Sequence, residues 1–168
     1  MEPVNVPIRI FSFILVTGAR DIETVRKGPF EAAEKMDNHE RIAAALLEQG
    51  LITLDDFLPS TLVAQLATEA IDLRQGQDWR PASIGRGAGQ HLNEGIRSDQ
   101  IRWLEPDTAT PAQRHYLGIL EELRQAINRT LFLGLFEFEG HLAVYPPGAF
   151  YRKHLDQFRG TQHRLVTV

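Results

Sequence analysis

Hydrophobic positions recur at helical spacing in three stretches of the chain. The first follows the capping residue Asp37 and stops before Gly50, a residue type that commonly terminates helices. The second begins at Ser60 and is expected to end near Gly76, and the third begins at Thr110, which is followed by proline at the first helical position. Their apolar faces consist of Ile42, Ala43, Leu46 and Leu47; Leu62, Val63, Leu66, Ala67, Ala70 and Ile71; and Tyr116, Leu117, Leu120, Leu123 and Ile127. We therefore predict three amphipathic helices packed on one core.

Shorter apolar runs, typical of strands, gather mainly in the last part of the chain. They are separated by turn residues and do not follow helical spacing. The segments predicted to be strands or extended chain are Leu51–Leu54, Ile96–Leu104, Leu131–Phe138, Leu142–Tyr145, Phe150–Asp156 and Arg164–Val168. Helices followed by strands predict an α+β fold.

One further apolar run, Ile8–Val16, lies in an N-terminal stretch that is unlike the rest of the chain. It could form a buried strand, belong to a disordered extension, or serve as the apolar part of a signal sequence, although Glu2 is unsuited to the basic start of such sequences. Helix-capping residues follow Met36 directly. We therefore expect residues 1–35 to be an upstream extension that is not native, and residues 36–168 to form the domain.

The composition narrows the range of functions. With 43% hydrophobic and 24% charged residues among 168, the chain is typical of a soluble protein of one domain. Its net charge of −4 provides no attraction to nucleic acid or to an anionic membrane, and no apolar run reaches the roughly 18 residues of a membrane span. The absence of cysteine excludes disulfides, thiol catalysis and thiolate metal sites. We expect a cytoplasmic location, with any metal held by His, Asp or Glu.

A pair of candidate metal ligands, His154 and Asp156, follows a proline–glycine turn. Residues two apart on an extended chain point to the same side, so the imidazole and the carboxylate could bind one ion. Such a pair is two thirds of the 2-His-1-carboxylate arrangement, which leaves positions on Fe(II) open for co-substrate and oxygen. The spacing alone is weak evidence, and a surface histidine near a turn aspartate would look the same.

The surroundings of this pair resemble the 2-oxoglutarate- and Fe(II)-dependent dioxygenases, specifically their prolyl 4-hydroxylase branch. That branch has a Tyr-Pro-Gly turn, an aromatic residue, His-x-Asp and an arginine that opens the next strand. The matching residues here are Tyr145, Pro147, Gly148, Tyr151, His154, Asp156 and Arg164. A second match, to the hypoxia-factor type of prolyl hydroxylase, consists of Arg97, Ser98, Asp99, Ile101 and Trp103. The two matches occur in the family's order, and the resemblance spans roughly residues 40–168.

The resemblance implies a double-stranded β-helix, or jelly roll, flanked by the N-terminal helices. It implies hydroxylation of a peptidyl proline in a protein or peptide substrate, with O₂ and 2-oxoglutarate consumed and succinate released. Fe(II) and ascorbate, which keeps the iron reduced, are implied in the same way. By carry-over, His154 and Asp156 would be iron ligands, and no catalytic residue beyond the metal ligands is implied.

The resemblance also assigns roles to residues around these ligands. Tyr145 would hydrogen-bond 2-oxoglutarate, although a packed strand tyrosine is an equally good interpretation of the sequence. Arg97 and Trp103 would contact the substrate. Asp99 and Arg164 would form a salt bridge that braces the substrate-covering loop, unless they are unrelated surface charges.

The sequence departs from the family pattern after Asp156. The family places a second ligand histidine several dozen residues further on, followed by a basic residue that pairs with the far carboxylate of 2-oxoglutarate. Here only 12 residues follow Asp156, among them His163 and Arg164, and His163 would have to loop back to a site it nearly adjoins. We therefore expect a C-terminally truncated dioxygenase domain that binds iron weakly and is inactive alone. Its incomplete sheet would leave an open edge capable of self-association.

Two other functions stay open at this stage. A non-catalytic module, either a truncated enzyme or a pseudo-enzyme, could be completed by a partner chain that adds a strand to the open edge. A cupin-like metal-binding protein also holds histidine ligands on a β-barrel, but it would not account for the match around Asp99 or for Tyr145. Stability in the presence of a chelator separates a binding module from a metal-dependent dioxygenase.

Overall fold

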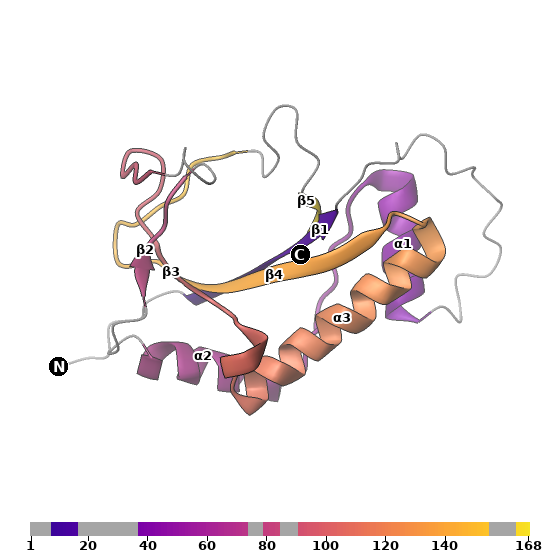
Figure 1. The fold of residues 1–168 in the computed structure, drawn as a ribbon, viewed down its shortest axis with the longest axis horizontal. Helices are drawn as coiled ribbons and strands as arrows, with labels where there is room; N and C mark the ends of the chain where they lie inside the picture. Colours follow the sequence, from indigo (N-terminus) through magenta and orange to yellow (C-terminus); the bar gives the residue numbers. More distant parts are fainter. Residues whose placement is uncertain (1–7, 17–36, 74–78, 85–90, 155–163) are drawn as a thin grey trace.

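The computed structural model describes residues 8–16, 37–73, 79–84, 91–154 and 164–168 of the chain. Within these ranges the chain forms a five-stranded antiparallel sheet and three α-helices (Figure 1). In chain order the elements are β1 (Ile8–Val16), α1 (Asn38–Gln49), α2 (Ser60–Leu73), β2 (Arg80–Pro81), β3 (Gln100–Trp103), the 3-10 turn η3 (Pro106–Thr108), α3 (Pro111–Leu131), β4 (Leu135–Val144) and β5 (Arg164–Thr167). The predicted mixture of helices and strands is confirmed.

The three predicted helices are present, and local capping explains where α1 and α3 begin. Asp37 accepts a hydrogen bond from the Glu40 amide at 2.8 Å, while the Glu40 carboxylate accepts one from the Asp37 amide, which together form a capping box. Thr110 and Gln113 form the same arrangement at the start of α3. Gly50 ends α1 with a φ of 75°, a left-handed conformation that glycine adopts at little cost. The residues beyond α2, where the expected stop at Gly76 falls, lie outside the described residues.

The strands lie in the order β2-β3-β4-β1-β5, so the second-longest strand, β1, is internal to the sheet. β4 pairs along one edge with β3, from Gln100 opposite Val144 to Trp103 opposite His141. Along its other edge it pairs with β1, starting with Ile8 opposite Val144. β1 in turn pairs with β5. Of the interpretations offered for residues 8–16, the strand is the one that the structure contains.

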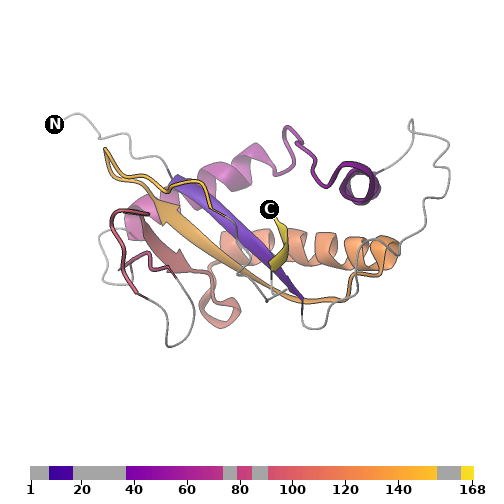
Figure 2. The ribbon, with the colours of Figure 1, turned by 90° about the horizontal axis from the view of Figure 1, so that it is seen from above.

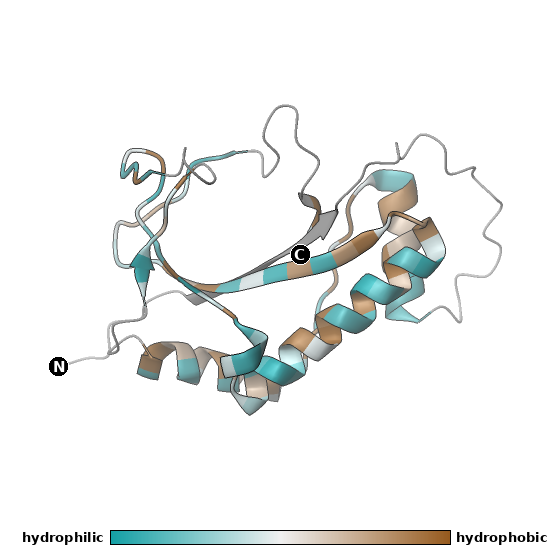
Figure 3. Cartoon of the chain, in the orientation of Figure 1, coloured by the Kyte–Doolittle hydropathy of each residue, from teal (hydrophilic) through white to brown (hydrophobic). Residues whose placement is uncertain are grey.

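The hydrophobic core lies between the sheet and α3 (Figures 1 and 2). From α3 it receives Leu120 and Ile127, and from β4 it receives Leu142, each no more than 1% exposed. Leu62 and Leu66 of α2 join the same core. Figure 3 shows apolar and polar residues alternating along α3, as expected for a helix with one face on the core. Burying an aliphatic side chain of this size contributes roughly 1.5–3 kcal/mol, so this layer is the main source of stability.

A bulge at the start of β4 decides which of its side chains are buried. Leu15 pairs with Glu137, but the next residue of β1 pairs with Leu135, so Phe136 is the extra residue in β4. Leu135 is fully buried in the core, whereas Phe136 is 65% exposed. Strict alternation would place Phe136 on the same face as Phe138, which packs against the core. The bulge therefore explains why one phenylalanine is inside and the other outside.

The turn from α3 into β4 is held by side chains of the helix. The Asn128 side chain donates to the Leu135 carbonyl oxygen and accepts from the Leu135 amide, both at 2.7 Å, as a neighbouring strand would. Arg124 also donates to this carbonyl. The chain reverses through Phe132 and Gly134, with φ values of 53° and 67°. Asn128 thus fixes the residue at which β4 begins.

Several predicted strand boundaries were wrong. Leu51–Leu54 forms no strand, because Ile52 and Leu54 pack against the core between α1 and α2 without a partner strand. The two runs predicted between Leu131 and Tyr145 are one strand, β4, and α3 extends to the first of these residues. The strand predicted over Ile96–Leu104 is limited to Gln100–Trp103.

Extended chain was predicted over Phe150–Asp156, and in its described part only Tyr151 forms a β-bridge. β5 has the predicted location, Arg164–Thr167. Among the described residues, the model contains no helix with the length and apolarity to cross a membrane.

Replacing the side chain that organises the α3–β4 turn should destabilise the protein. Asn128→Ala leaves the buried Leu135 amide without its partner, which costs about 1–3 kcal/mol. Urea unfolding monitored by circular dichroism measures this loss. The control is Glu122→Ala on the exposed face of the same helix, which should change the free energy of unfolding little. Equal stability of the two variants would contradict the role given to Asn128.

Candidate functional site

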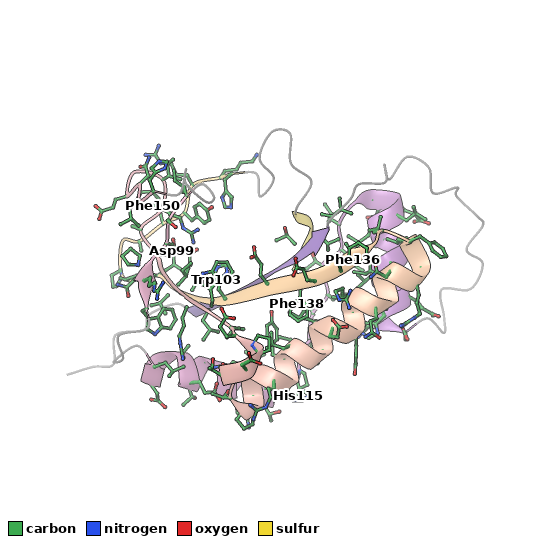
Figure 4. All side chains as sticks on the ribbon, viewed as in Figure 1. Asp99, Trp103, His115, Phe136, Phe138 and Phe150 are labelled. Atoms are coloured by element: carbon green, nitrogen blue, oxygen red, sulfur yellow. The ribbon has the colours of Figure 1, made fainter. Side chains whose placement is uncertain are left out.

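The candidate site residues lie on the face of the sheet that α3 does not cover. In β4 Leu142 faces the helices, so the alternating residues His141 and Tyr145 belong to the opposite face. Trp103 pairs with His141 across the strands, and their rings meet edge to face with centroids 5.0 Å apart. Figure 4 shows Trp103 and Phe138 on opposite sides of β4. Tyr145 is 8% exposed, and Trp103 is 41% exposed.

A turn brings the chain after β4 back over the residues that precede β3. The turn at Pro146 is closed by a hydrogen bond from the Ala149 amide to its carbonyl at 2.8 Å. The Ser98 amide then donates to the Phe150 carbonyl at 3.0 Å, and the Arg152 amide donates to the Ile96 carbonyl at 2.9 Å. These bonds surround a β-bridge between Arg97 and Tyr151. In this way the two sequence motifs, more than 40 residues apart, form one structural unit.

Arg97 and Asp99 form a buried ion pair with two-point geometry. Nε and Nη2 of Arg97 donate to the two carboxylate oxygens of Asp99 at 2.8 and 2.5 Å. The Asp99 side chain is fully buried and that of Arg97 is 10% exposed. Burial is the largest influence on the pKa of Arg97 and lowers it, but the hydrogen bond and charge of Asp99, with smaller contributions from Tyr151 and Tyr145, raise the pKa above its ordinary value. Arg97 is therefore a permanent cation at this site.

His154 is exposed, yet its ring is held by two contacts. Nδ1 lies 2.8 Å from the carbonyl oxygen of Arg152. Since a carbonyl oxygen only accepts, Nδ1 carries the proton in the neutral ring and the lone pair is on Nε2. The ring also stacks on Tyr151, with centroids 3.7 Å apart and planes at 18°. Metal-binding histidines commonly have this arrangement, in which one ring nitrogen donates to a carbonyl oxygen and the lone pair is on the other nitrogen.

The structure thus brings together five of the seven predicted site residues in its described part. Arg97 and Asp99 contact each other, while Trp103 and Tyr145 lie on the same face of the sheet. His154 is joined to this group through Tyr151. Asp156 and the side chain of Arg164 lie outside the described residues, so the second iron ligand and the Asp99–Arg164 brace remain predictions. Among the described residues there is no group of three or more His, Asp or Glu residues arranged to hold a metal.

Two features of the site were missed by sequence reasoning. The contact between Arg97 and Asp99 could have been anticipated, because residues two apart on an extended chain share a face. The place of Tyr151 between Arg97 and His154 had no comparable signal. It depends on the long-range bridge between the two motifs, which a single sequence does not reveal.

An antiparallel sheet with helices on one face and this aromatic and histidine site on the other agrees with the class indicated by the motifs, the prolyl 4-hydroxylase-like dioxygenases. No protein-family model matches the chain, and no curated protein matches it. Among solved structures the chain is similar to the crystal structure of a Pseudomonas putida prolyl-4-hydroxylase, with 43% sequence identity and a TM-score of 0.64. The match covers 71% of this chain and 61% of that one. The chain is therefore related to this prolyl-4-hydroxylase and spans about three fifths of its length.

Removing one half of the buried ion pair should be strongly destabilising. Asp99→Ala leaves a buried guanidinium without its carboxylate, for which a loss of about 3–5 kcal/mol is expected. Replacing both partners with apolar residues, Arg97→Met with Asp99→Leu, should recover most of this loss. Thermal and urea unfolding measure the series.

Two further variants complete this experiment, one as a control and one as a test of the expected brace between Asp99 and Arg164. Asp107→Ala, an exposed carboxylate in η3, should have little effect. Arg164→Ala tests the expected brace directly. If it destabilises the protein as much as Asp99→Ala does, Asp99 depends on Arg164 as well as on Arg97.

Proposed function

We propose that the chain is part of an Fe(II)- and 2-oxoglutarate-dependent dioxygenase that hydroxylates a peptidyl proline. The observation that carries this proposal is the state of His154 in the His-x-Asp motif, where a carbonyl oxygen fixes the proton on Nδ1. The relationship to a Pseudomonas putida prolyl-4-hydroxylase supports it. The double-stranded β-helix is proposed on the same relationship and on the antiparallel sheet.

Among the described residues, one side chain, that of His154, fits a role in holding iron. Nε2 of His154 is a neutral nitrogen ligand of the kind that Fe(II) accepts, and Asp156 would supply the carboxylate. Bound iron would supply the oxygen chemistry, with 2-oxoglutarate and O₂ consumed as co-substrates and ascorbate keeping the metal reduced. The chain itself binds, orients and shields the reacting groups.

The face around Trp103 suits an apolar substrate group. A proline ring within a peptide is uncharged, and the partly exposed indole offers it a flat apolar surface. Tyr145, on the same face, is proposed to hydrogen-bond 2-oxoglutarate. Arg97 is proposed to border the substrate as a permanent cation, with its orientation set by Asp99. Trp103 is therefore the residue of this group most suited to distinguish a proline-containing peptide from a free metabolite.

The alternative, a non-catalytic module completed by a partner chain, is favoured by one observation. β5 forms one edge of the described sheet and pairs only with β1 among the described strands. An additional strand, from a partner or from a second copy, could join this edge. A module of this kind should keep its stability in the presence of a chelator, whereas a metal site should not.

Manganese, a redox-stable substitute for Fe(II), should bind at His154. In NMR spectra of the 168-residue chain, Mn(II) should broaden the signals of residues 152–154 first, and 2-oxoglutarate should strengthen the effect. His154→Ala and Asp156→Ala should each abolish the selective broadening. His39→Ala, a change in the first turn of α1, is the control and should leave it intact. Broadening that is uniform, or that survives both site substitutions, would contradict the proposed function.

We also expect the 168-residue chain to bind metal weakly and to convert no 2-oxoglutarate to succinate. The resemblance transfers only two metal ligands to residues of this sequence, and weak binding follows from so few ligands. Succinate release, measured with Fe(II), ascorbate and a proline-containing peptide, checks this. Turnover that requires His154 would show that the chain supplies a complete site.

A further inference from the structure

Tyr151 lies between two functional side chains. The Arg97 Cζ atom is 4.0 Å from the centre of the Tyr151 ring, and the centre of the His154 ring is 3.7 Å from it. At these distances both groups cannot occupy the same face of the tyrosine without overlapping. They therefore lie on opposite faces, and the three side chains form a stack.

The Arg97 end of this stack is fixed by the core. Two hydrogen bonds to Asp99 define the plane of the guanidinium group, and Asp99 is only 1% exposed. A planar guanidinium is suited to lie against an aromatic ring, where charge and dispersion both contribute. The backbone bridge between Arg97 and Tyr151 holds the two residues in register. The position of the tyrosine ring is therefore set from the buried side of the site.

At the His154 end of the stack, two different interactions restrict the orientation of the imidazole ring. Stacking on Tyr151 fixes the plane of the imidazole. A rotation of the ring by 180° about the Cβ–Cγ bond would keep this plane and exchange the positions of Nδ1 and the carbon Cδ2. The hydrogen bond from Nδ1 to the Arg152 carbonyl distinguishes the two orientations. The stack and the hydrogen bond together leave one ring orientation and one tautomer.

From this arrangement we infer that Tyr151 is a positioning residue, which transmits the fixed geometry of the Asp99–Arg97 pair to the imidazole of His154. The inference rests on the proposed function, because His154 is there the iron ligand. It assigns to Arg97 a role exercised through Tyr151, in addition to the substrate contact proposed above. A surface histidine of this kind would otherwise sample several orientations.

The test uses NMR of the metal-free 168-residue chain labelled at histidine, with the His154 signals assigned by their loss in His154→Gln. In the unmodified chain the His154 ring protons should be shifted upfield by the stacked tyrosine, and the ¹⁵N signals should report the proton on Nδ1. Tyr151→Leu should move the ring protons downfield and the ¹⁵N signals toward a mixture of tautomers. Tyr151→Phe, which keeps the ring, should leave both unchanged.

A second measurement links the ring orientation to metal. Mn(II) affinity, from the selective broadening at residues 152–154, should fall several-fold in Tyr151→Leu and stay unchanged in Tyr151→Phe. Asn128→Ala, which acts on stability at the distant α3–β4 turn, should move neither the His154 signals nor the affinity.

Several outcomes would overturn the inference. Unchanged His154 signals in Tyr151→Leu would show that the tyrosine does not orient the ring. The same signal changes in Asn128→Ala would show a general loss of stability instead. Unchanged Mn(II) affinity despite moved signals would show that the orientation does not serve metal binding. If the unmodified chain shows no selective Mn(II) broadening, the proposed function fails, while the metal-free spectra still decide whether Tyr151 orients His154.

Discussion

Strand β4 imposes the constraint on which the rest of the structure depends. Its backbone is hydrogen-bonded on both edges, to β3 and to β1, and one of its faces is covered by α3. A strand held in this way has no freedom to slip, because a shift of one residue would turn its buried face toward solvent. Its register therefore determines where Trp103 and Tyr145 lie, and where the chain turns back to place His154. The packing of β4 against α3 therefore fixes the positions of the site residues on the opposite face of the sheet.

Within the candidate site, the exposure of the side chains rises step by step from Asp99 to His154. Asp99 is fully buried, Arg97 is nearly so, Tyr151 is half-buried and His154 is exposed. A ligand residue has to be accessible to bind a metal, and accessibility ordinarily brings disorder. The series of contacts resolves this conflict by giving each side chain a neighbour that is more firmly held than itself.

The parts of the fold that depend on local chemistry could be predicted from the sequence, and the long-range parts could not. The start of α1 at Asp37 and of α3 after Thr110 follow from capping within a few residues. The strand predicted at Leu51–Leu54 failed because strands need partners, and pairing is not a local property. The bulge at Phe136 escaped prediction for a similar reason, since it exists only relative to β1. In the site, the motifs pointed to His154 and Asp99, while the stack on Tyr151 depends on a bridge between distant segments.

The position of β1 has a consequence for the order in which the molecule can form. Phe13 pairs with Thr167, and Ile8 pairs with Val144. β1 can therefore join the sheet only after β4 and β5, which come much later in the sequence, have been synthesised. During synthesis the helices and the α3–β4 turn can form from neighbouring residues, whereas the run IRIFSFILV has no partner until β4 is complete. Uncharged apart from one arginine and rich in β-branched and aromatic residues, such a run is prone to pair with other chains. A slow completion of β4 should therefore prolong the time during which this run can pair with other chains.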